Sequence, residues 1–317
     1  MAAGSSLLNQ EQLDLLPKEL YWGSRELYQW EGFWYAADLL QGTLTLQSGY
    51  EARSDDVILA SSMKTGSTWL KALCASIMGS QSKGDDSEEN DELLVKNPHF
   101  IVKGLEYLVG RYNTTPDDLS AMPSPRLFHT HVPYSALPDS IKNSECKIVY
   151  IVRNPKDTLI SSWHFFNKVF RQPNEEPYPL EKAYDDFCRG IHQFGPFFDH
   201  ALQYWNKSLK NPEKILFLKY EDLKKDPEGE VTKLASFLGR PFQNKQQVEK
   251  VLWRSSLERL KNLEVNKDDS QPGLIMSSFF RRGVVGDWKN YLTEEMEQGL
   301  DVITRLKLEG SGLHFEI

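Results

Sequence analysis

The chain of 317 residues is 40% hydrophobic and 26% charged, enough apolar material for one large globular domain or two small ones. Its formal net charge of −8 argues against a nucleic-acid-binding protein, although an acidic protein can hold a locally basic pocket. Its three cysteines lack metal-ligand spacing, no run is long enough to span a membrane, and residues 1–20 lack a basic, apolar leader. We therefore expect a cytoplasmic protein that contacts neither nucleic acid nor membrane.

The N-terminal region divides into two parts. Residues 1–20 are expected to form a mobile lead-in and residues 21–317 one domain, because no internal repeat or second linker is visible. Aromatic residues crowd the stretch 21–35, a pattern more typical of core packing than of a ligand site. Trp34, in a Gly-Phe-Trp step, is still a candidate for lining an apolar pocket.

The stretch 56–78 predicts a buried strand that turns directly into a helix, because an apolar run with β-branched residues precedes a one-sided helical pattern. Such a helix start presents unpaired N–H groups and a positive dipole end, which favour an anion such as phosphate. Lys64, Gly66, Ser67 and Thr68 supply a charge, close backbone approach and two hydroxyl donors. The alternative is an ordinary turn with a capping serine and a solvated lysine.

A Walker A loop is excluded here, because the lysine precedes the glycine and the chain contains no Gly-Lys dipeptide. Residues 64–69, Lys-Thr-Gly-Ser-Thr-Trp, resemble the 5′-phosphosulfate loop of the cytosolic sulfotransferases, written Tyr-Pro-Lys-Ser/Thr-Gly-Thr-Thr-Trp. Ser62-Met63 stands in place of the usual Tyr-Pro. We expect the missing proline to loosen the turn, while the phosphate-contacting positions remain.

Two segments with histidines follow. Residues 97–100, Asn-Pro-His-Phe, are either a turn before a helix or, as the resemblance implies, a loop on the substrate side. A short apolar strand ends in His129 and His131, and histidine is the side chain best suited to take a proton near neutral pH. The Thr-His-x-Pro pattern matches the family's catalytic-base segment, which singles out His131. His129 stands where many animal members have lysine.

Residues 147–152 give the strongest strand signal, an almost continuous apolar run typical of the middle of a parallel sheet. This strand leads to Arg153 where a Walker B strand would end in aspartate, and the following helix carries Ser161. A cation at a strand end suits a second phosphate, and the alternative is a surface ion pair. The spacing Arg-Asn-Pro-x-Asp-x-x-x-Ser closely resembles the family's 3′-phosphate segment.

Two further motifs lie in the C-terminal third. A strand at 214–219 leads into Tyr220-Glu221-Asp222, which resembles the family's Tyr-Glu-Asp element. Residues 281–288, Arg-Arg-Gly-Val-Val-Gly-Asp-Trp, match the family's Arg-Lys-Gly-x-x-Gly-Asp-Trp signature with only the lysine changed to arginine. The sequences Trp-His-Phe at 163–165 and Leu-Glu-Val-Asn-Lys at 263–267 resemble the plant branch.

Alternating strands and helices, with phosphate ligands at strand ends, predict one α/β domain built on a parallel sheet. The resemblance to plant-type soluble sulfotransferases implies five central strands flanked by helices, with a P-loop-like phosphosulfate-binding strand-loop-helix. It also implies the donor 3′-phosphoadenosine 5′-phosphosulfate (PAPS), the product 3′-phosphoadenosine 5′-phosphate (PAP) and transfer of the sulfonate to an acceptor hydroxyl. No metal is expected, because fixed cations take the place of Mg²⁺.

The resemblance assigns a role to each matching residue. His131 is the general base, Lys64 stabilises the leaving phosphate oxygen, and Ser161 holds Lys64 until the acceptor arrives. The expected donor ligands are Lys64, Thr65, Gly66, Ser67, Thr68, Trp69, Arg153, Ser161, Tyr220, Ser256, Arg281, Arg282 and Gly283. The candidates for the acceptor pocket are Trp34, His99, Phe100 and Phe165.

Two other functions fit parts of the pattern: a P-loop-like nucleotide kinase, and a donor-binding protein without turnover. The kinase lacks a Walker lysine and an evident Mg²⁺ carboxylate, and the presence of His131 and Lys64 argues against a protein without turnover. Aromatic content favours a small apolar or aromatic acceptor, such as a flavonoid, a steroid or a jasmonate-like alcohol. Because the family's dimer segment is only partly present at Lys289 and Thr293, we expect a monomer, with a weak dimer as the alternative.

Overall fold

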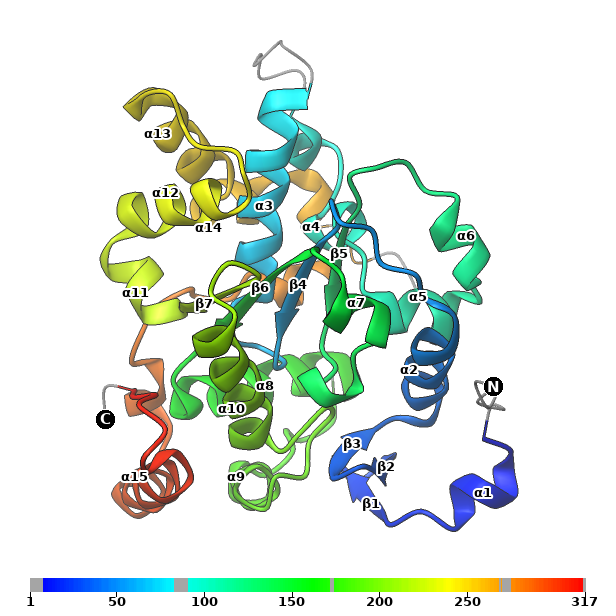
Figure 1. Cartoon of the computed structure of the whole chain (residues 1–317). Helices are drawn as coiled ribbons and strands as arrows, with labels where there is room; N and C mark the ends of the chain where they lie inside the picture. Colours follow the sequence, from blue (N-terminus) through cyan, green and yellow to red (C-terminus); the bar gives the residue numbers. More distant parts are fainter. Residues whose placement is uncertain (1–7, 83–90, 172–173, 268, 270–274, 316–317) are drawn as a thin grey trace.

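The computed structural model describes residues 8–82, 91–171, 174–267, 269 and 275–315. Four parallel strands lie at the middle of the molecule with helices on both sides (Figure 1). They are β5 (Leu127–Thr130), β4 (Val57–Ser61), β6 (Lys147–Val152) and β7 (Ile215–Lys219), in that spatial order. The predicted strands at 147–152 and 214–219 are therefore confirmed to within one residue, and so are the strand at the start of the stretch 56–78 and the short strand before His131.

The expected count of five central strands is wrong for the described residues, where the sheet has four. Beside β5 the chain makes a single parallel bridge, between Gly104 and His129, and the His129 N–H donates to the Lys103 carbonyl at 2.9 Å. Helix α5 (Leu105–Tyr112) begins directly after this bridge. The segment that ends at Gly104 therefore continues as a helix and does not pair further with β5.

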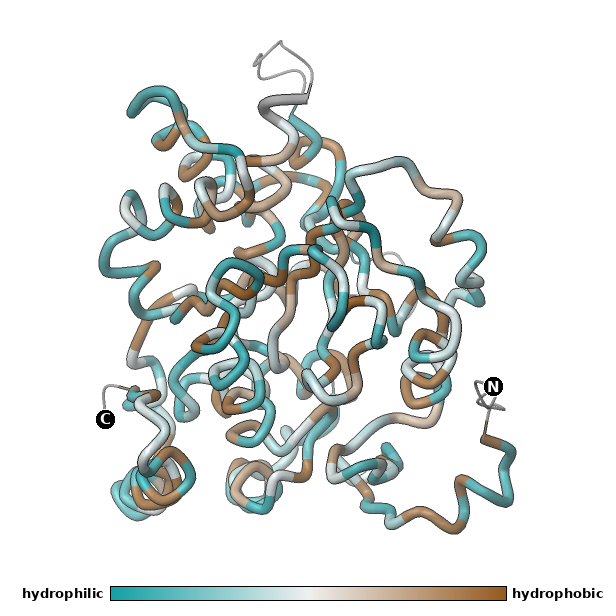
Figure 2. Tube along the Cα trace, in the orientation of Figure 1, coloured by the Kyte–Doolittle hydropathy of each residue, from teal (hydrophilic) through white to brown (hydrophobic). Residues whose placement is uncertain are grey.

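Both faces of the sheet are buried, which explains its almost unbroken apolar strands. Along β6, Ile148 and Tyr150 belong to one core cluster and Val149 and Ile151 to another. Because successive side chains of a strand point to opposite faces, the two clusters lie on opposite sides of the sheet. Figure 2 shows brown, hydrophobic colour through the central strands and alternating teal and brown on the surrounding helices.

The helices form two layers against these clusters. Helix α3 (Ser67–Ser82) contributes Leu70, Leu73, Cys74 and Ile77 to the second cluster, together with α12 (Pro227–Phe237) and α13 (Lys245–Arg254). The other face is covered by α2 (Ala37–Gly49), α8 (Pro155–Phe170) and α10 (Phe197–Lys210). The remaining α-helices are α1 (Gln10–Asp14), α4 (Pro98–Ile101), α6 (Pro116–Ser120), α7 (Asp139–Asn143), α9 (Leu180–Cys188), α11 (Tyr220–Lys225), α14 (Leu257–Asn262) and α15 (Glu294–Leu308).

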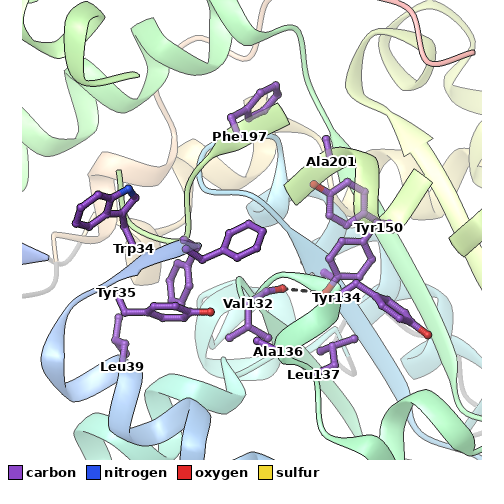
Figure 3. Packing of buried hydrophobic residues seen from close by; sticks show 14 of the residues in the cluster. Trp34, Tyr35, Leu39, Val132, Tyr134, Ala136, Leu137, Tyr150, Phe197 and Ala201 are labelled. Atoms are coloured by element: carbon purple, nitrogen blue, oxygen red, sulfur yellow. Dashed lines mark hydrogen bonds between the residues drawn. The ribbon is translucent and has the colours of Figure 1, made fainter. Parts of the chain in front are cut away.

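A second, antiparallel sheet precedes the parallel one and consists of β1 (Lys18–Tyr21), β2 (Arg25–Trp30) and β3 (Phe33–Tyr35). The aromatic crowding of residues 21–35 therefore builds these strands and packs them into the first core cluster. Figure 3 shows Trp34 and Tyr35 in this cluster, together with Tyr150 from β6 and Phe197 from α10. The expected lead-in, residues 1–20, contains α1 and most of β1, and its first seven residues lie outside the described part.

Candidate active site

The carboxyl ends of the four parallel strands meet at one edge of the sheet, because neighbouring strands run in register. Ala60 of β4 pairs with Thr130 of β5, Ser61 with Ile151 of β6, and Val152 of β6 with Lys219 of β7. His131 follows the end of β5, and Lys64 follows the end of β4. Arg153 follows β6, and Tyr220 follows β7. Four motifs that are far apart in sequence are thereby brought together where α/β sheets bind ligands.

The loop between β4 and α3 has a tight, partly left-handed backbone. Lys64 has φ +65° and Gly66 has φ +110°, a conformation that L side chains rarely adopt. A Cβ atom on Gly66 would lie 2.8 Å from Cδ2 of Tyr220, so the glycine allows the loop to lie against that ring. The Thr65 hydroxyl bonds to the carbonyls of Ser62 and Ile151 at 2.9 and 3.0 Å. Thr65 therefore anchors the loop to β6, and its part in donor binding would rest on its backbone.

A cavity of about 800 Å³ opens beside this loop. Among its lining residues are all of the expected donor ligands except Thr65, and further cations join them. The lining includes Lys64, Gly66, Ser67, Thr68, Trp69, Arg153, Ser161, Lys168, Tyr220, Lys224, Ser256, Lys261, Arg281, Arg282 and Gly283. Such a concentration of cations around one cavity suits a molecule that carries several negative charges.

Arg153 is buried at the end of β6, which contradicts the alternative of a surface ion pair. Its guanidinium lies 4.6 Å from the ring centroid of Tyr220, 3.4 Å from a carboxylate oxygen of Asp157, and donates to the Val284 carbonyl at 2.7 Å. Its Nε has no hydrogen-bond partner among the described residues. A buried N–H without a partner is costly, so a phosphate oxygen from a ligand would fit this site.

Two buried carboxylates hold the loop that carries the paired arginines. Asp157 accepts hydrogen bonds from the backbone N–H groups of Gly286 and Trp288 at 2.8 and 3.2 Å. Asp287 binds Arg281 at 2.5 Å and Arg282 at 2.7 Å. Burial alone would raise the pKa of Asp287, but the hydrogen bonds from Arg281 and Asn290 lower it below its usual range. The carboxylate is thus ionised and fixes both arginines at the cavity.

The Lys64 ammonium lies over the ring of Phe165, 3.8 Å from its centroid, and 5.5 Å from that of Phe279. Burial, which has the largest effect, and the charges of Arg153 and Arg281 together lower the pKa of Lys64 to about 7. No hydrogen bond joins Lys64 to Ser161 in the part of the chain that the structure describes. An anion in the cavity would favour the charged form of the lysine.

The same cavity also has aromatic and apolar lining residues. Trp69 and Tyr220 meet edge to face, with ring centroids 5.6 Å apart. Ser256 caps α14 by accepting from the Arg259 N–H at 3.2 Å, and Leu257 also lines this cavity. Flat aromatic surfaces of this kind favour a heterocyclic base.

His131 is held in a single orientation by three hydrogen bonds. Its Nδ1 donates to the Ser61 carbonyl at 2.8 Å, its backbone N–H donates to Glu106 at 2.8 Å, and its carbonyl accepts from His200 at 2.9 Å. Because Nδ1 carries the proton, Nε2 keeps the lone pair. Burial lowers the pKa of His131 to about 3, so the imidazole is neutral at pH 7. This is the form that a base requires.

His131 lines a second cavity, of about 480 Å³. This cavity shares the lining residues Phe165, Ser278 and Phe279 with the first, so the two cavities adjoin. Of the four candidates for the acceptor pocket, His99, Phe100 and Phe165 line it. Trp34 does not; it is buried in the first core cluster, and its backbone bonds to Phe194 and Gly195.

The sequence reasoning missed Lys71 of α3, which also lines the second cavity. Its side chain is 3% exposed, and its ammonium donates to Nδ1 of His99 at 3.0 Å, while Nε2 of His99 bonds to Thr68 at 2.9 Å. The signal was a lysine within an otherwise apolar helical segment, next to Leu70. The sequence reasoning also missed Glu106, which binds the His131 backbone, and Tyr107. Both lie on α5, whose sequence contains no recognisable motif.

This parallel sheet, with cations at its carboxyl edge and a neutral histidine beyond them, defines a protein that binds a polyanionic donor next to a second molecule. Residues 54–312 match the sulfotransferase domain family. The chain therefore belongs to the sulfotransferases, and it is a PAPS-dependent enzyme of that family.

Its relatives cover almost the whole chain. It is 43% identical to cytosolic sulfotransferase 12 of Arabidopsis thaliana, across 98% of this chain and 96% of that one. It is also similar in structure to a putative steroid sulphotransferase of Arabidopsis thaliana, with a TM-score of 0.77 and 36% identity over 99% of this chain and all of the other. A mouse sulfotransferase solved in complex with PAP gives a TM-score of 0.70 and 28% identity, over 90% and 95% of the two chains.

Two further observations concern the described residues. None of the helices within them is long and apolar enough to cross a membrane. Nor do they contain a group of three histidine, cysteine, aspartate or glutamate side chains placed to hold a metal ion.

The predictions of a plant-type sulfotransferase and of PAPS as donor are confirmed by the family match and the relatives.

Proposed function

We propose that this enzyme transfers the sulfonate of PAPS to a hydroxyl group of a small apolar or aromatic metabolite in the cytosol. The observation that carries the proposal is the arrangement of His131, with its free Nε2 in the second cavity, which adjoins the first cavity, lined by Lys64. PAPS would occupy the larger cavity and supply an activated sulfonate. The cytosolic location is supported by the names of the relatives, such as cytosolic sulfotransferases 12 and 7 of Arabidopsis thaliana.

The donor contacts divide into two groups. Lys64, Gly66, Ser67 and Thr68 would hold the 5′ side, supported by the positive end of α3. The 3′-phosphate would be held by Arg153, Ser161, Arg281, Arg282 and Gly283, and the adenine by Trp69, Tyr220 and Ser256. The burial of Arg153 and the fixed arginine pair support the second group, because they place preorganised cations at one end of the cavity.

The chemistry then needs two groups from the chain. Nε2 of His131 takes the proton of the acceptor hydroxyl as its oxygen attacks sulfur. The bond between sulfur and the bridging phosphate oxygen breaks, and Lys64 stabilises the negative charge that grows on that oxygen. The products are the sulfated acceptor and PAP, with the proton on His131 released to water. Ser161 holding Lys64 before the acceptor arrives stays a prediction.

The acceptor pocket supports an apolar or aromatic substrate, since seven phenylalanine and tyrosine rings line it: Phe100, Tyr107, Tyr112, Phe165, Phe166, Phe170 and Phe279. A flavonoid, a steroid and a jasmonate-like alcohol each fit this description. The relative described as a putative steroid sulphotransferase lends some support to the steroid. We also propose a monomer, to be checked by light scattering, and a domain that begins near residue 21, ahead of the family match at residue 54.

Incubation with radiolabelled PAPS and a panel of hydroxylated plant metabolites tests the reaction. We expect label in at least one acceptor, equal rates with and without EDTA, and no phosphate transfer from ATP. Phosphate transfer from ATP that EDTA abolishes would indicate a nucleotide kinase instead. Calorimetric binding of PAP without product from any acceptor would indicate a donor-binding protein.

A further inference from the structure

The acceptor cavity has a strongly unbalanced charge. Its lining includes the cations Lys71, Lys103 and Arg111 and no carboxylate among the described residues. Arg111 is already paired with Asp38 at 2.6 Å, and Lys103 is exposed to solvent. Lys71 differs from both, because it is buried and lies deep enough that its charge lowers the pKa of His129 and His131 after the larger effect of their burial.

Lys71 has no anionic partner in the described part of the chain. No carboxylate lies within 4.0 Å of its ammonium, whose one hydrogen bond goes to the neutral ring of His99 at 3.0 Å. The charge of Glu106 raises the pKa of Lys71, but the two carboxylate oxygens of Glu106 already bind the Thr130 hydroxyl at 2.9 Å and the His131 backbone N–H at 2.8 Å. The ammonium therefore keeps two N–H donors for a molecule in the cavity.

A buried cation without a counter-ion is unfavourable. Burial lowers the pKa of Lys71 to about 7, which is the usual response of a lysine removed from water. His129 adds a second unsatisfied group on the same wall, since its Nδ1 is buried and has no hydrogen-bond partner in the region described. A ligand that carried one negative charge would offset the cost of the buried ammonium by pairing with it. A polar atom of the same ligand beside His129 would satisfy its Nδ1.

We propose that the natural acceptor is a hydroxylated carboxylic acid whose carboxylate pairs with Lys71. This inference rests on the proposed function and narrows it, because neutral flavonoids and steroids lack the anion. One lysine matches a singly charged carboxylate, whereas a phosphate dianion would need further cations. The sulfonate of the donor is a less suitable partner, because Lys71 lines only the acceptor cavity and Lys64 only the donor cavity.

The experiment compares acids with their carboxamides, which keep the shape and remove the charge. The probes are 4-hydroxybenzoate, 4-hydroxyphenylacetate, p-coumarate and 12-hydroxydodecanoate, each with its amide, so that the distance between hydroxyl and carboxylate varies. With saturating PAPS, we expect at least one acid to exceed its amide about tenfold or more in kcat/KM, the effect of a single charge-assisted pair. Comparable values in every pair would overturn the inference.

Three variants assign the preference to the lysine. Lys71→Met should lower kcat/KM for the preferred acid about tenfold or more, and leave that for the amide within about threefold. Lys71→Arg should retain the preference, and Lys233→Met, an exposed lysine on α12, should match the wild type. PAP affinity and the melting temperature verify that each variant is folded.

The outcomes separate this inference from the proposed function. Equal loss for acid and amide in Lys71→Met would overturn the carboxylate pairing, since the lysine would then serve the transfer itself. Efficient sulfonation of the amides alone would overturn the inference and leave the sulfotransferase reaction intact. Failure to sulfonate any probe or neutral phenol, with PAP still bound, would overturn both.

Discussion

The proposed donor and acceptor cavities of this sulfotransferase are built in different ways. The donor side takes its ligands from segments that follow β4, β6 and β7, and buried carboxylates such as Asp157 and Asp287 hold its arginines. The acceptor side takes its walls from α4, α5, α8 and the segment around Phe279, mostly through aromatic packing. His129 and His131 at the end of β5, and Met63 after β4, connect the acceptor side to the sheet edge.

This difference suggests where specificity resides. A network of buried charges and hydrogen bonds tolerates little change, because each group that loses its partner is costly. Aromatic packing can be altered one side chain at a time without leaving a buried charge unpaired. We therefore expect substitutions on the donor side to impair the enzyme with every acceptor, and those on the acceptor side to change which acceptor is used.

The largest expected effect comes from the proposed base in the acceptor cavity. His131→Ala should lower turnover by about two orders of magnitude or more, the scale of losing a general base. PAP affinity should hardly change, because the imidazole lines only the acceptor cavity. Steady-state kinetics and calorimetry test this, with His314→Ala as a control in an exposed region. Near-normal turnover would redirect attention to His129.

Lys64→Met should lower turnover about 100-fold while PAPS affinity falls only a few-fold. The charge on the leaving oxygen grows as the bond breaks, so the lysine matters more in the transition state than in the ground state. Among acceptors that share a shape but differ in hydroxyl pKa, Lys64→Met should reduce turnover to a similar degree. Full turnover at saturating donor would reduce Lys64 to a phosphate clamp.

Arg153→Ala should show the opposite signature, a loss of affinity. PAP binding should weaken by about 2 kcal/mol, or roughly 30-fold, as expected for a charge-assisted pair. Binding of adenosine 5′-phosphate, which lacks the 3′-phosphate, should change much less. Isothermal titration with both ligands distinguishes this from a structural role, for which the two losses would be equal.

Gly66→Ala tests the backbone of the loop between β4 and α3, the proposed phosphosulfate loop. Alanine is strained at the φ of +110° found here, and its added Cβ would lie 2.8 Å from the Tyr220 ring. The loop or the ring should therefore move, and PAP binding should weaken about tenfold. Gly79→Ala is the matched control, because this glycine of α3 has nothing within 4 Å of its added Cβ. Equal PAP affinity in the two variants would show that the loop adapts.

The smallest expected effect is a pH dependence of donor binding. Lys64 in the free protein has a pKa of about 7, and bound phosphate favours its charged form, so PAP binding above pH 7 should take up a proton. Affinity should therefore fall as pH rises from 7 to 8, by up to about tenfold. Calorimetry at pH 7.5 in two buffers of different ionisation enthalpy measures the proton, and Lys64→Met should remove most of it.

The sequence by itself determined the four strands of the parallel sheet, the loop that joins the first of them to a helix, and the positions of Arg153 and His131. Strong apolar runs with glycine and charged residues at their ends decide such elements locally, and parallel strands bring their carboxyl ends together. The spacing of the Arg-Asn-Pro-x-Asp-x-x-x-Ser motif did not decide, however, whether Arg153 lies at the surface or in the interior. Its contact with Val284, 131 residues later in the chain, decided it.

Only the tertiary structure decided the features that depend on distant segments. The fifth strand is reduced to one bridge at Gly104, because α5 begins directly after it. Trp34 lies in the core, since the N-terminal sheet packs against the first cluster, and Thr65 turns toward β6 because the Ile151 carbonyl accepts its hydroxyl. The buried Lys71 follows the same rule: a helical pattern gives its position on α3, but the absence of an anion within reach in the described residues is a property of the folded cavity.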